Sequence, residues 1–363
     1  MWGEKIENFA IVGGEINGGY IVEGDPNGRD IGDKVIAIKS SRNLLFENVT
    51  CNTGGHVVYL LNDCENVTLA NITIKKSRDG VNLVGCRNVQ MRDCHFIGLG
   101  DDAVALKSDY ALGRRIDSRN IYVWNCYFET AAGALQIGSE TLGDFRNVNF
   151  WNIRIARAWK AAIGINSNDG AIIDEANYRD ITVTDAACPI FVRVTDRLRS
   201  GEPSKKIGAI RNVTITNLNA TQSKPGEEGW PRTCLISGLP ESRLENIKLE
   251  NVRIVFPGSG NQQLSDSVPY RGGGKQQLPA SAFYIRQAAQ VLLRNVQVGF
   301  DKPDARPALV ASDVNEFKLE GFKCDASPRV EMLRLEKIAN FSVRNSPGLK
   351  DRAAETVESL VTE

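Results

Sequence analysis

Apolar and polar residues alternate in short runs that recur along most of the chain. In the copy that begins at Cys86, Val89 and Met91 alternate with polar residues, Asp93 interrupts the pattern, and Phe96 resumes it. This alternation predicts two short β-strands that meet at an Asn or Asp bend. Related phrases are "SRNLLFENVTC" at 41, "CENVTLANITI" at 64, "SRNIYVWNCYF" at 118, "FRNVNFWNIRI" at 145, "IRNVTITNLNA" at 210 and "LENIKLENVRI" at 244.

The spacing of this repeat is short and uneven. Equivalent asparagines are 22 residues apart between Asn66 and Asn88, and 34 residues apart between Asn212 and Asn246. A helical repeat would keep a nearly constant length, and a leucine-rich repeat would hold leucines at fixed offsets. The coils of a parallel β-helix instead tolerate extra residues as loops on one side. We therefore predict an all-β, single-domain parallel β-helix over residues 1–345, in which like residues stack along the axis.

The last segment, residues 346–363, departs from the repeat. Ala353, Val357 and Leu360 fall on one face of a helix. The exposed end of a repeat array needs a cover for its apolar interior. We expect a C-terminal tail that forms a capping helix or frays at the end of the stack.

Composition narrows the choice of partners. The 44 basic and 44 acidic residues cancel, so we expect neither nucleic acid nor an anionic membrane as a partner held by bulk charge. No apolar run reaches the length of a membrane span, and the start "MWGEKIENFAIVGG" lacks the pattern of a secretory signal. We expect a soluble protein that is cytoplasmic, or exported if a preceding segment has been removed.

The cysteines and histidines do not form a metal-binding pattern. The 8 cysteines include no C-x-x-C pair, and the chain has only 2 histidines. We expect reduced, buried cysteines that act as small apolar side chains, and no metal site.

Three aspartates in two neighbouring copies of the repeat are candidates for chemistry. Asp79 lies in "SRDGVNL" and the pair Asp101 and Asp102 lies in "GDDAVALKS"; Asp101 follows Asp79 by 22 residues, about one short coil. Clustered carboxylates raise one another's pKa, so one can hold a proton while another stays a base. Inverting glycosidases use such a division between acid and base, with water admitted between them. Aspartates that only stabilise turns, or that bind calcium, remain alternatives.

The region around these aspartates resembles a known family. "SRDGVNLVGCRNVQMRDCHFIGLGDDAVALKS", residues 77–108, looks like the core signature of the polygalacturonase-type glycoside hydrolases of family 28, in which N-T-D-G is followed about one coil later by G-D-D. The segment "ALQIGSETLGDFRNV" at 134–148 is similar to the I-G-S segment of that family, especially in bacterial members. The resemblance covers roughly residues 35–345.

The resemblance implies a fold and an activity. It implies a right-handed parallel β-helix that hydrolyses glycosidic bonds in a pectin-like or other plant or algal polysaccharide or oligosaccharide, with inversion and without a cofactor. Carried over by position, Asp101 would be the general acid, and Asp79 with Asp102 would position and activate the water.

The chain also departs from the family pattern. Gly133 stands where the family has a histidine, and Gly164 and Asn166 stand where it has an arginine and a lysine that hold the carboxylate of the substrate. Loss of both cations removes the contacts that favour a uronate over a neutral sugar. We therefore expect a substrate with a neutral or differently decorated sugar rather than unmodified galacturonate.

Other polar residues near these motifs are candidates for contacts with the substrate. They are Lys107, Arg114, Arg115, Gln136, Glu140, Lys160, Asn166, Asn168 and Asp169. Two other functions stay open: a calcium-dependent β-helix polysaccharide lyase, with Arg114 as the base, and a non-catalytic carbohydrate-binding β-helix. The sequence does not determine the oligomeric state.

Overall fold

Every element in the described part of this computed structural model is a β-strand. The structure describes residues 1–19, 21–22, 31–199, 201, 205–222, 233–258, 278–325 and 331–362, and no helix occurs among them. The prediction of an all-β chain is therefore confirmed. No helix that is long and apolar enough to cross a membrane is present in these residues.

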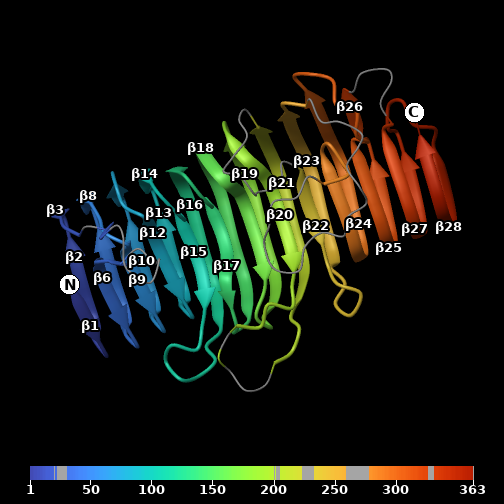
Figure 1. Cartoon of the computed structure of the whole chain (residues 1–363). Helices are drawn as coiled ribbons and strands as arrows, with labels where there is room; N and C mark the ends of the chain where they lie inside the picture. Colours follow the sequence, from blue (N-terminus) through green and yellow to red (C-terminus); the bar gives the residue numbers. More distant parts are fainter. Residues whose placement is uncertain are drawn as a thin grey trace.

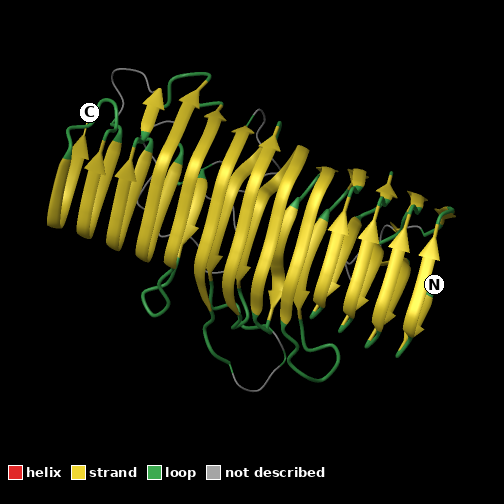
Figure 2. Cartoon of the chain, turned by 180° about the vertical axis from the view of Figure 1, so that it is seen from behind, coloured by secondary structure: helices red, strands yellow, loops and turns green. Residues whose placement is uncertain are grey.

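The strands stack side by side, with the N-terminus at one end of the stack and the C-terminus at the other (Figure 1). Most strands pair in parallel with the equivalent strands of the preceding and following coils. The strands of successive coils lie side by side along the stack (Figure 2), and their pairings define three ladders, A, B and C. Ladder A contains β1 (Trp2–Glu4), β6 (Lys34–Lys39), β9 (Val57–Asn62), β12 (Asp79–Val84), β15 (Val104–Ser108), β17 (Leu135–Thr141), the end of β18 (Phe145–Ser167), β20 (Ala186–Val194) and β22 (Cys234–Ser237).

Ladders B and C complete each coil, and the longer strands bend from one ladder into the next. Ladder B contains β2 (Glu7–Val12), β7 (Arg42–Glu47), β10 (Glu65–Ala70), β13 (Arg87–Arg92), β16 (Ser118–Thr130), β18, β19 (Ile172–Val183), β21 (Ala209–Thr221) and β23 (Glu245–Phe256). Ladder C begins with β3 (Glu15–Asn17), β8 (Thr50–Thr53), β11 (Thr73–Ile74) and β14 (His95–Leu99) and ends at β26 (Lys323–Asp325). The long strands β24 (Phe283–Phe300), β25 (Leu309–Glu320) and β27 (Leu333–Arg344) extend the stack, and β4 (Ile21–Val22) pairs with β5 (Ile31–Gly32) outside it.

Successive side chains of a strand point to opposite faces, so the alternating apolar residues all face the inside of the coil and form the core there. Val89 and Met91 of β13 are fully buried, and they align with the buried Ile121 and Val123 of β16 in the next coil. Seven of the cysteines are buried thiols without a disulfide, as expected: Cys51, Cys64, Cys86, Cys94, Cys126, Cys188 and Cys234.

Asparagines form the bends between ladders A and B. Asn88, Asn120 and Asn147 have φ angles of 55°, 57° and 57°, a left-handed conformation that asparagine adopts more readily than most residues. The Nδ2 of Asn120 donates to Asn88 Oδ1 at 2.9 Å, and the Nδ2 of Asn147 donates to Asn120 Oδ1 at 2.9 Å. The recurring asparagine therefore supplies both the bend and a hydrogen bond between coils.

We expect the substitution Asn120→Ala to lower the free energy of unfolding by about 2 kcal/mol. Alanine loses both hydrogen bonds of the ladder and holds a positive φ at a steric cost. Denaturant unfolding measures the change, and Asn120→Gly, which relieves only the backbone cost, should lose less. Equal stability of Asn120→Ala and the wild type would contradict this role.

The expectation of a capping helix in the tail is wrong. Residues Arg352–Thr362 form β28, which pairs antiparallel with β27, and Val357 aligns with Ile338 while Leu360 aligns with Leu335. The last parallel strand offers a row of unpaired backbone groups, and a strand satisfies them where a helix cannot. The tail does cover the end of the stack, in extended form.

Candidate active site

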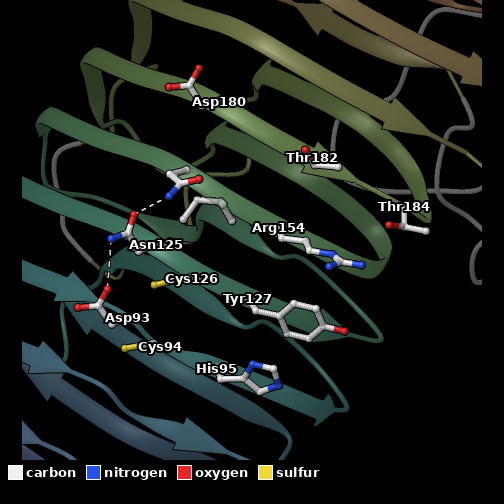
Figure 3. Close-up of a pocket in the computed structure, with 12 residues that line it drawn as sticks. Asp93, Cys94, His95, Asn125, Cys126, Tyr127, Arg154, Asp180, Thr182 and Thr184 are labelled. Carbon is white, nitrogen blue, oxygen red and sulfur yellow. Dashed lines mark hydrogen bonds between the residues drawn. The ribbon is translucent and has the colours of Figure 1, made fainter.

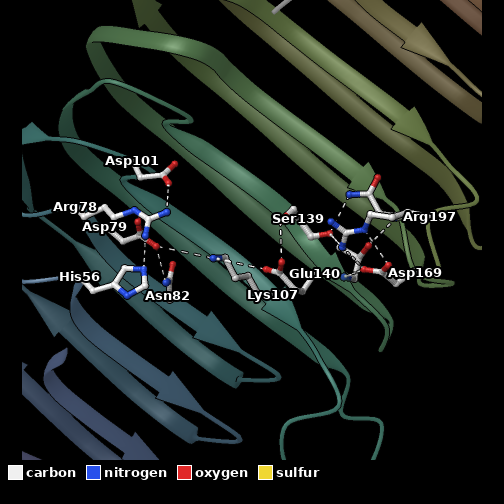
Figure 4. A network of polar contacts seen from close by, with 12 residues as sticks. His56, Arg78, Asp79, Asn82, Asp101, Lys107, Ser139, Glu140, Asp169 and Arg197 are labelled. Atoms are coloured by element: carbon white, nitrogen blue, oxygen red, sulfur yellow. Dashed lines mark hydrogen bonds and ion pairs between the residues drawn. The ribbon is translucent and has the colours of Figure 1, made fainter. Parts of the chain in front are cut away.

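Asp79 and Asp101 lie near each other on ladder A (Figure 4), and Asp102 is close enough for the charges of both to act on it. Asp79 opens β12, and Asp101 and Asp102 lie in the turn before β15. The backbone fixes their neighbourhood, because the Asp101 N–H donates to Arg78 O at 2.8 Å and the Gly80 N–H donates to Asp102 O at 2.9 Å. Stacking of adjacent coils thus brings residues 22 positions apart into one cluster.

Asp101 is held between two cationic side chains. Arg78 Nη2 lies 3.1 Å from Asp101 Oδ2, and Lys160 Nζ lies 3.1 Å from Asp101 Oδ1. Burial acts to raise the pKa of Asp101, but the charges and hydrogen bonds of Lys160 and Arg78 outweigh it and lower the pKa below its ordinary value. Asp101 is therefore a stable anion.

Asp102 has a different environment. Its Oδ1 accepts a hydrogen bond from the Gly133 N–H at 3.1 Å, and no Lys, Arg or His nitrogen of the described residues lies within 4.0 Å of its carboxylate. Burial, followed by the negative charge of Asp101, raises the pKa of Asp102 to about 7, although Lys107 opposes the shift. Two adjacent carboxyls thus differ in protonation near neutral pH.

Asp79 is 5% exposed. Its Oδ2 accepts a hydrogen bond from Asn82 Nδ2 at 2.9 Å, whereas its buried Oδ1 has no partner among the described residues. Burial raises the pKa of Asp79, and the charge of Lys107 opposes this shift. Neighbouring atoms cover this oxygen almost completely, which agrees with the raised pKa of the carboxyl.

Lys107 connects the aspartates with Glu140. Its Nζ lies 3.9 Å from Asp79 Oδ2 and 3.8 Å from Glu140 Oε2, and its side chain is 19% exposed. Burial acts to lower the pKa of Lys107, but the charges of Asp102, Asp79 and Glu140 raise it overall. Lys107 therefore stays protonated and neutralises part of the cluster.

Two cations expected near the cluster contact other residues. Arg114 pairs with Asp63, and Arg115 pairs with Asp144 and, at 3.8 Å, with Asp117. These contacts hold the connection between β15 and β16 against neighbouring coils. Among the described residues, neither arginine forms an ion pair with Asp79, Asp101 or Asp102, and their contact with a substrate stays a prediction.

Gln136 and Asn166 occupy the region where the family pattern has its two cations. A Cβ atom added to Gly164 would lie 2.0 Å from Gln136 Oε1, so the glutamine side chain covers this glycine. Asn166 Nδ2 donates to Ile137 O at 3.3 Å, and Asn166 Oδ1 accepts from Arg193 Nε at 3.0 Å. Arg193, in register with Asn166 one coil later, places a cation that the sequence motif does not reveal.

Asn168 and Asp169 support the backbone of β17 instead of facing the aspartates. Asn168 Nδ2 donates to Ser139 O at 2.9 Å. Asp169 accepts from the Thr141 N–H at 3.1 Å and from Arg197 Nε at 3.0 Å. Burial acts to raise the pKa of Asp169, but the hydrogen bonds that it accepts outweigh burial and lower the pKa. The largest of these contributions comes from Arg197.

Sequence reasoning missed His56 and Arg78. His56 Nε2 lies 2.6 Å from Arg78 Nη1, and because arginine can only donate, this nitrogen of His56 accepts. Burial, followed by the charge of Arg78, lowers the pKa of His56. Arg78 directly precedes Asp79 in the motif, so the sequence could have indicated that it lies near the aspartates. His56 is far from the motif in sequence and reaches the site only because the coils stack.

A separate hollow of about 730 Å³ lies on ladder C (Figure 3). Asp93 and Asp180 line it, but Asp79, Asp101 and Asp102 do not. The ring of His95 stacks on that of Tyr127 at 4.4 Å, and the Arg154 guanidinium lies 5.9 Å from the Tyr127 ring. These side chains contact one another from coil to coil, as the asparagines do. Among the described residues, no group of three or more His, Cys, Asp and Glu side chains is arranged to hold a metal ion.

The fold and the site together define a class of protein: a stack of parallel coils with a cluster of aspartates on one ladder. Arg78, Lys107 and Lys160 form ion pairs with these aspartates. The family model of the glycosyl hydrolases family 28 matches residues 1–269 of the 363, and the chain belongs to that family.

One solved structure that is similar is a hyperthermoactive exopolygalacturonase from Thermotoga maritima. The match has 18% sequence identity and a TM-score of 0.36, and it covers 90% of this chain. The chain spans only 58% of the length of that enzyme. No curated protein matches the chain.

Proposed function

We propose that this chain is a right-handed parallel β-helix enzyme that hydrolyses glycosidic bonds in a pectin-like or other plant or algal polysaccharide or oligosaccharide, with inversion of configuration. The observation that carries the proposal is the different surroundings of two adjacent carboxyls: Asp101 lies 3.1 Å from both Arg78 Nη2 and Lys160 Nζ, whereas Asp102 Oδ1 accepts from the Gly133 N–H at 3.1 Å. The two cations lower the pKa of Asp101, and burial raises the pKa of Asp102 to about 7. Membership of glycosyl hydrolases family 28 supports the same activity.

Carboxyls with divergent pKa values suit this reaction. Hydrolysis of a glycosidic bond needs a proton for the leaving oxygen and a negative group that assists the attacking water. Asp79, Asp101 and Asp102 supply both forms at one pH, because their environments differ in burial and in contacts with cations. No metal ion or cofactor is part of this proposal.

The substrate that we propose is a neutral or decorated sugar rather than unmodified galacturonate. The amide of Gln136 covers Gly164, and Asn166 is buried and hydrogen-bonded to Ile137 and Arg193. The amides at these two positions lack the charge that favours a carboxylate, but Arg193 beside Asn166 is a cation, so a sugar that carries a carboxylate is the alternative substrate. Lys107 and Lys160 contact aspartates, and we propose that they also approach the hydroxyls of a bound sugar.

A panel of pectic, hemicellulosic and algal glycans tests the activity. Incubation with and without a chelator should produce new reducing ends, no unsaturated chromophore and no effect of the chelator. Proton NMR of the first products should show the inverted anomer. A chelator-sensitive rise in ultraviolet absorbance would instead indicate a lyase. Binding without cleavage on any glycan, unchanged in Asp79→Asn, would indicate a carbohydrate-binding protein.

A further inference from the structure

The outer face of ladder C carries a column of polar side chains that continues from coil to coil. In register, the column runs through His95, Tyr127, Arg154, Thr182, Asn219 and Arg253. Each of these side chains is exposed or half-buried, because its neighbours along the strand point into the core. The column contains no acidic residue. Its side chains therefore offer donors and positive charge along the axis of the stack.

The hollow of about 730 Å³ on ladder C surrounds the first part of this column. His95, Tyr127, Arg154, Thr182 and Thr184 are among the residues that line it. Figure 3 shows the ring of Tyr127 between His95 and Arg154, across successive strands. The two rings stack at 4.4 Å, and the guanidinium lies 5.9 Å from the Tyr127 ring. These contacts hold the three side chains in one row.

Arg154 brings a positive charge to the hollow that no carboxylate neutralises. No Asp or Glu oxygen of the described residues lies within 4.0 Å of its guanidinium nitrogens. The two carboxyls that line the hollow pair with other arginines: Asp93 with Arg92 at 2.9 Å and Asp180 with Arg179 at 3.3 Å. A planar guanidinium binds an anionic group through two parallel hydrogen bonds. The hollow thus suits a ligand that carries negative charge.

Arg253 repeats this feature further along the column. It lies three coils beyond Arg154, which is about 14 Å at about 4.8 Å a coil. Its side chain is exposed, and no carboxylate of the described part of the chain lies within 4.0 Å of it. Thr182 and Asn219 lie between the two arginines and present a hydroxyl and an amide. An acidic sugar chain likewise carries charged groups at intervals with hydroxyls between them.

We propose that ladder C carries a second glycan-binding site. Arg154 and Arg253 bind carboxylate or sulfate groups of an acidic polysaccharide chain, and Thr182 and Asn219 bind hydroxyls between them. The site lies on another ladder than the clustered aspartates, so it holds a chain without taking part in bond cleavage. A second point of attachment raises the effective concentration of the polysaccharide near those aspartates. Binding at this site does not require the proposed hydrolysis.

Nucleic acid is the other elongated polyanion, and the column suits it less well. Tight binding of duplex DNA neutralises many phosphates at once, and the 44 basic residues of the chain are balanced by 44 acidic ones. The column offers two arginines without an ion pair among the described residues, and hydroxyl and amide groups separate them. Duplex DNA therefore serves as a competitor in the test.

Calorimetric titration with polygalacturonate, its carboxyl-reduced form and a sulfated galactan tests the site, in the Asp101→Asn background that slows cleavage. Arg154→Ala should raise the Kd of the acidic polymer about tenfold, and Arg154→Ala with Arg253→Ala about 100-fold. The better of the two acidic polymers distinguishes carboxylate from sulfate. The neutral polymer should bind all variants equally weakly. An unchanged Kd in the double variant, or displacement by duplex DNA at equal charge concentration, would overturn the proposal.

Arg119→Ala is the matched control, because it removes an exposed arginine from ladder B. It should leave the Kd unchanged, and a loss equal to that of Arg154→Ala would show that only overall charge matters. Arg154 is also exposed, so its variant should keep the unfolding midpoint of the wild type. In the active enzyme, Arg154→Ala should raise KM more on the polysaccharide than on a trisaccharide. Binding that depends on Arg154 without any cleavage would refute the proposed function alone.

Discussion

Replacing Lys107 by Met is expected to lower the free energy of unfolding by about 3 kcal/mol near pH 8, because the variant leaves buried carboxylates without their shared cation. Lys107 lies within 4 Å of both Asp79 and Glu140, and its side chain is largely buried. Its raised pKa shows that the folded protein favours the charged amine. This contribution is present below the ordinary pKa of 10.5 and is lost as the pH rises through the higher value of the folded state.

The pH dependence distinguishes a buried ion pair from simple packing. Near pH 4, protonation of the neighbouring carboxyls removes most of what Lys107 neutralises, so the loss in Lys107→Met should shrink there. Denaturant unfolding at both pH values measures the difference. Lys107→Arg keeps the charge and should retain more than half of the stability. A loss of equal size at both pH values would mean that the aliphatic stem of Lys107, not its charge, stabilises the fold.

Replacing Asp102 by Asn should make the protein more stable near pH 8, although it removes one of the three clustered carboxyls. The pKa of about 7 exceeds the ordinary value of 3.8, so the folded protein binds this proton more tightly than the unfolded chain does. Stability from this group is present below pH 3.8 and is lost as the pH rises through about 7. Asparagine never ionises, and the gain near pH 8 is on the order of 3 kcal/mol.

Unfolding curves of Asp102→Asn and the wild type near pH 4 and near pH 8 test this expectation. The two proteins should be close in stability at the lower pH and diverge at the higher one. Asp301→Asn, at an exposed position, is the matched control and should change neither value. A variant that is less stable than the wild type at both pH values would show that ionised Asp102 is well satisfied in the folded protein. The prediction also implies that keeping an ionisable carboxyl at this site lowers the stability of the protein near pH 8.

Local patterns in the sequence account for most of the fold. The alternation around Val89 and Met91 predicts a strand because only one face of that strand can be buried, and the asparagine at 88 predicts a bend because it accepts a positive φ. The tail shows where such reasoning ends. The spacing of Ala353, Val357 and Leu360 is helical, but the open edge of β27 decides in favour of a strand.

The sequence by itself determined the repeat, the all-β class and the one-coil spacing that sets Asp79 beside Asp101 and Asp102, because these depend on residues that are close along the chain or in regular register. Only the tertiary structure decided which charges meet the aspartates. Lys160 and His56 come from other coils, while Arg114 and Arg115 turn to Asp63 and Asp144. Electrostatic effects depend on distances of a few ångströms and on burial, and these follow from side-chain direction and uneven coil lengths that no local pattern encodes.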